Sequence, residues 1–149
     1  MEGMDPLAVL AESRLLPLLT VRGGEDLLGL ARVLEEEGAG ALETARRTEN
    51  GLAALKALRK SGLLLGAGTV RSPKEAEAAL EAGAAFLVSP GLLEEVAALA
   101  QARGVPYLPG VLTPTEVERA LALGLSALQF FPAEPFQGAR VLKAYAEVF

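Results

Sequence analysis

Five glycines recur along the chain at nearly even intervals, and this spacing restricts the fold more than any other feature. Each follows an amphipathic segment of helical length, where a left-handed backbone at the helix C-terminus favours glycine. A regular period of this size indicates stacked supersecondary units. The glycines are Gly38, Gly62, Gly83, Gly104 and Gly124, which lie 24, 21, 21 and 20 residues apart.

Short apolar runs alternate with these helices and are predicted to be strands. Ser72 and Thr113 each precede a proline and have a glutamate three residues later, which is the spacing of a helix capping box. Strands that alternate with helices of this length favour βαβ units and a parallel sheet. The predicted strands span residues 15–21, 41–45, 63–66, 85–89, 105–108 and 126–131, with a leading helix at 5–12 and a last helix at 137–148.

The count of six units points to an incomplete barrel. A closed (β/α)8 barrel has eight units and typically about 250 residues, whereas this chain has 149. A doubly wound sheet would suit the length, but the turn Gly66-Ala67-Gly68-Thr69 is too short for a dinucleotide-binding fingerprint. We predict an α/β fold of the parallel (β/α)8 TIM-barrel type with six βα units. Residues 1–149 would form one domain, incomplete at its C-terminus, with exposed first and last strands.

Composition excludes several kinds of chemistry. The chain has no Cys and no His, which removes thiolate nucleophiles, Ser-His pairs and the commonest metal ligands. A net charge of −5 argues against nucleic acid as a partner. Without a long apolar run or a leader-like N-terminus, we expect no membrane span and a cytoplasmic location. The abundance of Ala, Leu, Glu and Arg is compatible with a thermophilic source.

Polar and small residues gather where the predicted strands end, on one rim of a parallel barrel. If 126–131 is a strand, Leu128 and Phe130 face the covering helices and Gln129 faces inward. By the same alternation Glu43 faces inward, although a later strand start would leave it solvated. Taken singly, the turns near Thr69 and Pro90 are ordinary strand-ending turns. Their coincidence on one rim is the signal for a site.

The ordered motifs resemble those of the 2-keto-3-deoxy-6-phosphogluconate (KDPG) and 4-hydroxy-2-oxoglutarate (KHG) aldolases. The resemblance runs along the whole chain. The segments that carry it are residues 15–21, 43–48, Gly66-Ala67-Gly68-Thr69-Val70, Val88-Ser89-Pro90-Gly91, Pro109-Gly110-Val111, Thr113-Pro114-Thr115-Glu116 and Phe130-Phe131-Pro132-Ala133-Glu134.

This resemblance implies a class I aldolase on a (β/α)8 barrel, assembled as a homotrimer and needing no metal or other cofactor. In the family, a lysine on the sixth strand forms a Schiff base with a keto acid such as pyruvate. Carried over by position, Glu43 moves protons, Arg47 holds the pyruvate carboxylate and Thr69 lines the pocket. Pro90 and Phe131 form the pocket wall.

This sequence departs from the family pattern at positions that take part in the family's reaction. The position of the Schiff-base lysine is Gln129, whose amide nitrogen cannot form an imine because its lone pair is delocalised into the carbonyl. On the second strand, Thr44 and Arg46 replace apolar residues and Ala45 lacks an inward hydroxyl. The last two βα units of the family are also missing. The lysines present are predicted to face solvent on helical segments: Lys56, Lys60, Lys74 and Lys143.

Three hypotheses follow. The first is a catalytically disabled, aldolase-derived scaffold that retains oligomer assembly, either a homotrimer or a designed assembly. The second is an aldolase acting on small 2-keto acids by an enol route through Glu43 and Arg47, which leaves the enolate poorly stabilised. The third is a pyruvate-binding module. The changes at Gln129 and on the second strand fit deliberate redesign or relaxed selection in a paralogue.

Overall fold

The computed structural model describes residues 3–45 and 49–149, which form six strands and seven helices in alternating order. Arg46, Arg47 and Thr48 therefore lie outside the described residues. The elements are α1 (Pro6–Ser13), β1 (Leu18–Leu19), α2 (Leu27–Glu36), β2 (Ala41–Ala45), α3 (Asn50–Leu58), β3 (Leu64–Gly68), α4 (Pro73–Glu81), β4 (Phe86–Ser89), α5 (Glu94–Arg103), β5 (Tyr107–Val111), α6 (Pro114–Ala122), β6 (Gln129–Phe130) and α7 (Gly138–Tyr145).

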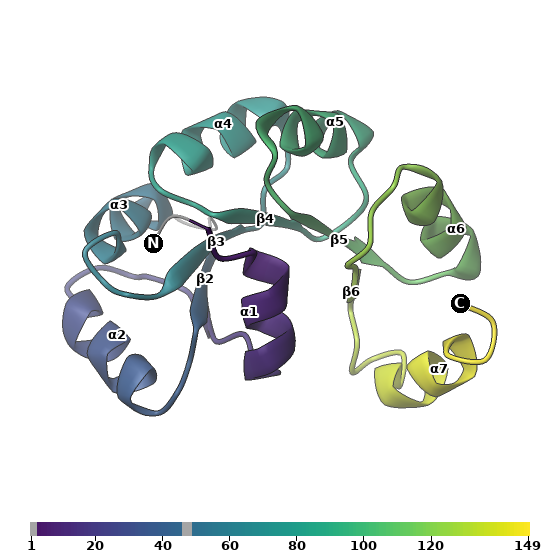
Figure 1. Cartoon of the computed structure of the whole chain (residues 1–149), viewed down its shortest axis with the longest axis horizontal. Helices are drawn as coiled ribbons and strands as arrows, with labels where there is room; N and C mark the ends of the chain where they lie inside the picture. The colour runs from purple at the N-terminus through teal and green to yellow at the C-terminus, as the bar shows by residue number, and fades with distance from the viewer. Residues whose placement is uncertain (1–2, 46–48) are drawn as a thin grey trace.

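The six strands form one curled parallel sheet in the order β1-β2-β3-β4-β5-β6. Figure 1 shows the sheet as an open arc, with α3, α4 and α5 on its convex side and α1 on its concave side. This confirms the parallel α/β architecture and the six units, as expected of a TIM-like fold. β1 and β6 are the two edges of the arc, as predicted from the sequence.

Local signals explain most helix boundaries. The Thr113 hydroxyl accepts a hydrogen bond from Glu116 N, and the Glu116 carboxylate accepts one from Thr113 N, so the predicted capping box is present. Four of the five periodic glycines adopt the expected positive φ, and Gly62 does not. The α3 helix ends earlier, at Leu58, whose carbonyl accepts the Ser61 hydroxyl at 2.7 Å. Gly62 is thus part of the approach to β3, and its assignment as a helix C-cap is wrong.

The strand boundaries differ from the prediction in a consistent way. β3 continues through Gly68 and β5 through Val111, so two predicted turns are in fact strand. β6 is only two residues long. Its pairing with β5 begins at Gln129, opposite Gly110. Pro109 offers no N–H to a ladder, which accounts for pairing that starts only beyond it.

The two faces of the sheet bury different side chains. Leu42, Leu65 and Leu87 pack on the convex side with residues of α3, α4 and α5. Alternate positions, such as Ala41 and Phe86, pack on the concave side, where Leu10 of α1 joins them. This alternation follows from the two-residue period of a strand. Leu42 therefore faces the helices.

Thr44 is the exception on the helix-facing side of β2. It is fully buried, and its strand partners are Leu19 and Ala67. Within the described part of the chain its Oγ1 atom has no hydrogen-bond partner. The expectation that this position suits an apolar side chain is therefore consistent with its surroundings.

Over residues 3–45 and 49–149, every helix falls short of the length and hydropathy needed to cross a bilayer.

Candidate functional site

Gln129 projects from β6 toward the carboxyl end of β4. Its Nε2 donates a hydrogen bond to the Ser89 carbonyl oxygen at 3.2 Å. The flanking residues face the other way, since Leu128 packs with the Val117 cluster and the Phe130 ring meets Tyr145 edge-on at 6.2 Å. The alternation predicted from the sequence places Gln129 as expected. The inward polar group of β6 is thus an amide already engaged as a donor.

Ser89 links three strand ends, and sequence reasoning treated it only as part of a turn. The residue is fully buried at the end of β4. Its hydroxyl donates to the Val70 carbonyl at 2.6 Å, while its own carbonyl accepts from Gln129. Ser89 therefore fastens β6 and the segment after β3 to β4. In the sequence, a serine that ends an apolar strand run is the signal that points to such a role, because a buried hydroxyl needs a hydrogen-bond partner.

Glu43 lies over Gly68, on the concave side of the sheet. A Cβ atom built on Gly68 would collide with the Glu43 carboxylate, so glycine is needed for this close approach. Gly66 serves a different neighbour, because a Cβ there would collide with the Phe86 ring. The glycines of this strand thus make room for a carboxylate and for an apolar core residue. Two glycines close together in the sequence, Gly66 and Gly68, were the signal from which this close packing could have been predicted.

Thr69 follows β3 with φ of +57°, a left-handed conformation. For a β-branched residue this is a genuine outlier and costs about 1–2 kcal/mol. The neighbouring Val70 amide donates to the Val88 carbonyl at 3.0 Å, which helps hold the backbone in this shape. Such strain concentrates at functional sites. Thr69 is therefore placed at the rim in a conformation that its surroundings enforce.

The other residues predicted for the site are Pro90, Phe131 and Arg47. The Pro90 carbonyl lies directly over Gly110, where a Cβ atom would collide with it. Because Gly110 pairs with Gln129, Pro90 belongs to the same set of strand ends as the amide. Phe131 is 45% exposed. Arg47, the predicted carboxylate-binding residue, lies outside the described residues.

The four lysines all lie outside this rim. Lys56 is in α3, Lys74 in α4 and Lys143 in α7, while Lys60 follows α3, and each is exposed. This confirms their predicted exposure. Metal-ligand clusters of three or more His, Cys, Asp or Glu side chains are absent from residues 3–45 and 49–149. The described rim therefore offers a carboxylate, an amide, hydroxyls and backbone groups.

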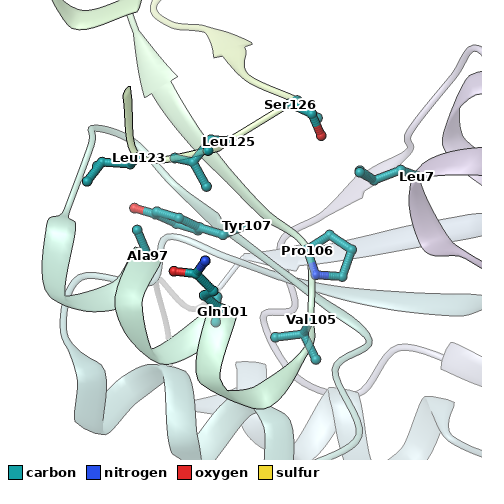
Figure 2. Close-up of a pocket in the computed structure, with 12 residues that line it drawn as sticks. Leu7, Ala97, Gln101, Val105, Pro106, Tyr107, Leu123, Leu125 and Ser126 are labelled. Atoms are coloured by element: carbon teal, nitrogen blue, oxygen red, sulfur yellow. The ribbon is translucent and has the colours of Figure 1, made fainter. Parts of the chain in front are cut away.

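A separate cavity of about 170 Å³ lies at the opposite ends of β5 and β6. Figure 2 shows Leu7, Pro106 and Ser126 at its edge and Tyr107 along its wall. The Tyr107 hydroxyl donates to the Gly91 carbonyl, and burial raises its pKa above the usual value. None of the predicted site residues lines this cavity. We interpret it as a packing gap away from the rim.

A curled parallel sheet with convergent polar groups at the carboxyl ends of its strands defines a TIM-like α/β protein, the class in which chemistry occurs on that rim. The sequence model of KDPG and KHG aldolases matches residues 7–149. The chain belongs to the KDPG and KHG aldolase family.

Curated aldolases are among the proteins that this chain resembles in sequence. A 2-dehydro-3-deoxy-phosphogluconate aldolase of Treponema pallidum is 41% identical over 138 residues, covering 91% of this chain and 66% of the relative. The chain spans about two thirds of the length of the curated relatives it matches. A 4-hydroxy-2-oxoglutarate/2-dehydro-3-deoxyphosphogluconate aldolase from TTHB1 is 94% identical, with a TM-score of 0.96, over 99% of this chain and 74% of that one.

Two further solved structures bear on chemistry and assembly. A KDPG aldolase of Legionella pneumophila, with pyruvate captured as a covalent carbinolamine, has a TM-score of 0.88 and 35% identity over 98% of this chain and 72% of that one. A cube-shaped cage designed by fusing symmetric oligomeric domains has a TM-score of 0.77 and 28% identity. That match covers 87% of this chain and 50% of the cage chain.

Proposed function

We propose that this chain is an aldolase-derived scaffold that has lost Schiff-base catalysis and retains oligomer assembly. The proposal rests on the side chain at position 129. Where the family uses a lysine amine, this chain has the Gln129 carboxamide, which donates a hydrogen bond to the Ser89 carbonyl. The cytoplasm is the proposed location, and no metal or cofactor is required.

Imine formation needs a free amine that attacks the keto carbon and then expels water. The Gln129 amide cannot do this, and the four lysines are exposed on helices or just after one. Glu43 keeps a carboxylate near the rim, yet a carboxylate alone does not stabilise the enolate that develops when the carbon–carbon bond breaks. We therefore place the enol route through Glu43 and Arg47 well behind the scaffold hypothesis.

Assembly is the retained role in this proposal. We propose that the fold is a (β/α)8-type barrel with six of its units in this sequence, and that copies associate as a homotrimer. The match to a cage built from symmetric oligomeric domains supports assembly as a use of this fold. Sedimentation equilibrium should give three times the monomer mass of 15.5 kDa. A purely monomeric chain at micromolar concentration would contradict this part of the proposal.

A second candidate is non-covalent binding of pyruvate or a related small 2-keto acid. It is favoured by two features: the Glu43 carboxylate, which lies over Gly68 near the rim, and the enforced left-handed conformation of Thr69. In this hypothesis Arg47 binds the ligand carboxylate, and Pro90 and Phe131 wall the pocket. Titration with ¹³C-labelled pyruvate, followed by NMR, distinguishes binding from its absence.

The decisive experiment is reduction with borohydride in the presence of pyruvate, followed by intact-mass analysis. We expect no adduct for the unmodified chain. Gln129→Lys should form one adduct per chain if the rim is otherwise intact, and Gln129→Met, which also lacks an amine, should form none. A stoichiometric adduct on the unmodified chain would refute the disabled-scaffold proposal.

A further inference from the structure

Two hydrogen bonds from different parts of the chain meet at Ser89, the last residue of β4. Its carbonyl accepts from Gln129 Nε2 at 3.2 Å, although β5 lies between β4 and β6 in the sheet. Its hydroxyl donates to the Val70 carbonyl at 2.6 Å. Ser89 and Val70 are both fully buried. One buried residue therefore joins the inward side chain of β6 to the segment that follows β3.

The segment after β3 is held in place by β4. The pairing of the two strands ends at Ala67. Beyond it, the Val70 amide donates to the Val88 carbonyl at 3.0 Å, and the Val70 carbonyl accepts the Ser89 hydroxyl. Thr69 lies between the end of the pairing and these two bonds, with its φ of +57°. A strained backbone persists only where its surroundings over-determine it, so these bonds to Val70 are the restraint that we expect to matter.

The side chain at position 129 bears on this restraint through Ser89. A carbonyl oxygen can only accept, so Gln129 must turn its NH₂ group toward it. The carbonyl and the hydroxyl of Ser89 belong to the same residue, and a rotation that changes the direction of one also changes that of the other. Hydrogen bonds weaken steeply when they bend. Loss of the Gln129 donor should therefore weaken the bond from the Ser89 hydroxyl to Val70.

We propose that Gln129 is a positioning residue, which acts through Ser89 to hold Thr69 in its left-handed conformation. The amide serves as a hydrogen-bond donor that keeps the rim in one shape. An ammonium group at the same position can donate in the same way, whereas a thioether cannot. The proposal requires neither imine chemistry, pyruvate binding nor oligomer assembly, so it stands or falls separately from the proposed function.

Native-state hydrogen exchange of the Val70 amide measures this coupling. The Leu87 amide is the reference, because it donates to the Pro106 carbonyl at the same distance of 3.0 Å on β4. Gln129→Met removes the donor and keeps a similar side-chain length. It should speed exchange at Val70 roughly tenfold relative to Leu87, as expected for the loss of about one hydrogen bond. Gln129→Lys retains a donor and should leave the ratio of the two rates unchanged.

Ser89→Ala tests the route of the coupling. The variant removes the hydroxyl that binds the Val70 carbonyl, so exchange at Val70 should speed up in this background alone. Gln129→Met should then add no further change, because two substitutions on one pathway are not additive. If Gln129→Met has its full effect in the Ser89→Ala background, the coupling does not pass through the Ser89 hydroxyl and the proposal is wrong.

Tyr145→Phe is the matched control. The Tyr145 hydroxyl donates to the Leu112 carbonyl at 2.7 Å, so this variant also removes one hydrogen bond to a backbone carbonyl near a strand end. The ratio of Val70 to Leu87 exchange should not change. The proposal is overturned if Gln129→Met leaves that ratio unchanged, or if the control or Gln129→Lys raises it as much as Gln129→Met does. These comparisons decide the matter even if Ser89→Ala does not fold.

Discussion

Replacing Thr44 with valine should stabilise the fold. Thr44 is fully buried on the helix-facing side of β2, between Leu19 and Ala67, and its hydroxyl has no hydrogen-bond partner within the described part of the chain. An unsatisfied buried hydroxyl costs about 1–3 kcal/mol. Valine replaces it with a methyl group of similar size and suits a strand equally well. The free energy of unfolding should rise by about 1–3 kcal/mol, and Tm by about 2–4 °C for each kcal/mol.

Urea unfolding followed by far-UV circular dichroism is the suitable assay, because the chain has no Trp and only two Tyr. Thr44→Ser serves as the control, since it keeps the hydroxyl and removes the methyl group. It should lower stability by about 1 kcal/mol. If Thr44→Val is no more stable than the unmodified chain, the hydroxyl has a partner and the reasoning is refuted.

Three further predictions concern the rim and the capping of α6. Gly68→Ala should cost about 1–3 kcal/mol of unfolding free energy through the clash with Glu43, and less in a Glu43→Ala background; equal costs in a double-mutant cycle would exclude the clash. Hydrogen bonds from Thr113 hold the pKa of Glu116 below its usual range, so its stabilisation is complete above the unfolded-state pKa of about 4.3 and is lost as pH falls through the folded-state pKa. Glu116→Gln should therefore be less stable at neutral pH and converge with the unmodified chain in acid; a gap that does not change with pH would contradict this. Thr69→Gly should stabilise by up to about 1 kcal/mol in thermal unfolding, because relief of the positive φ exceeds the entropy cost of glycine, whereas Thr69→Ala should gain less.

Much of the architecture was accessible from local patterns. The capping box at Thr113 acts over three residues, and the inward position of Gln129 follows from the two-residue period of a strand. The strand ends were predicted less well. Gly68 and Gly110 look like turn residues by composition, yet both lie inside strands, because a glycine in a strand is chosen for what packs over it.

The candidate site was only partly predictable for the same reason. Glu43, Thr69, Pro90 and Gln129 were identified from the sequence, the first and last with an inward orientation. The part played by Ser89 was not identified, because it acts through its backbone carbonyl and through a hydroxyl bound 19 residues away in the chain. Sequence pattern reports which side chains are present and does not report which carbonyl a distant amide will reach.

The sequence by itself determined the six-unit parallel architecture and the lack of an inward amine on β6, because both depend on residue identity and on periods of a few residues. Only the tertiary structure decided that Gln129 binds the Ser89 carbonyl 40 residues away, that Glu43 lies over Gly68, and that the Thr44 hydroxyl is buried among apolar partners. Those contacts depend on how far the sheet curls and on the register between strands. Both are set by the packing of the whole arc rather than by any one segment.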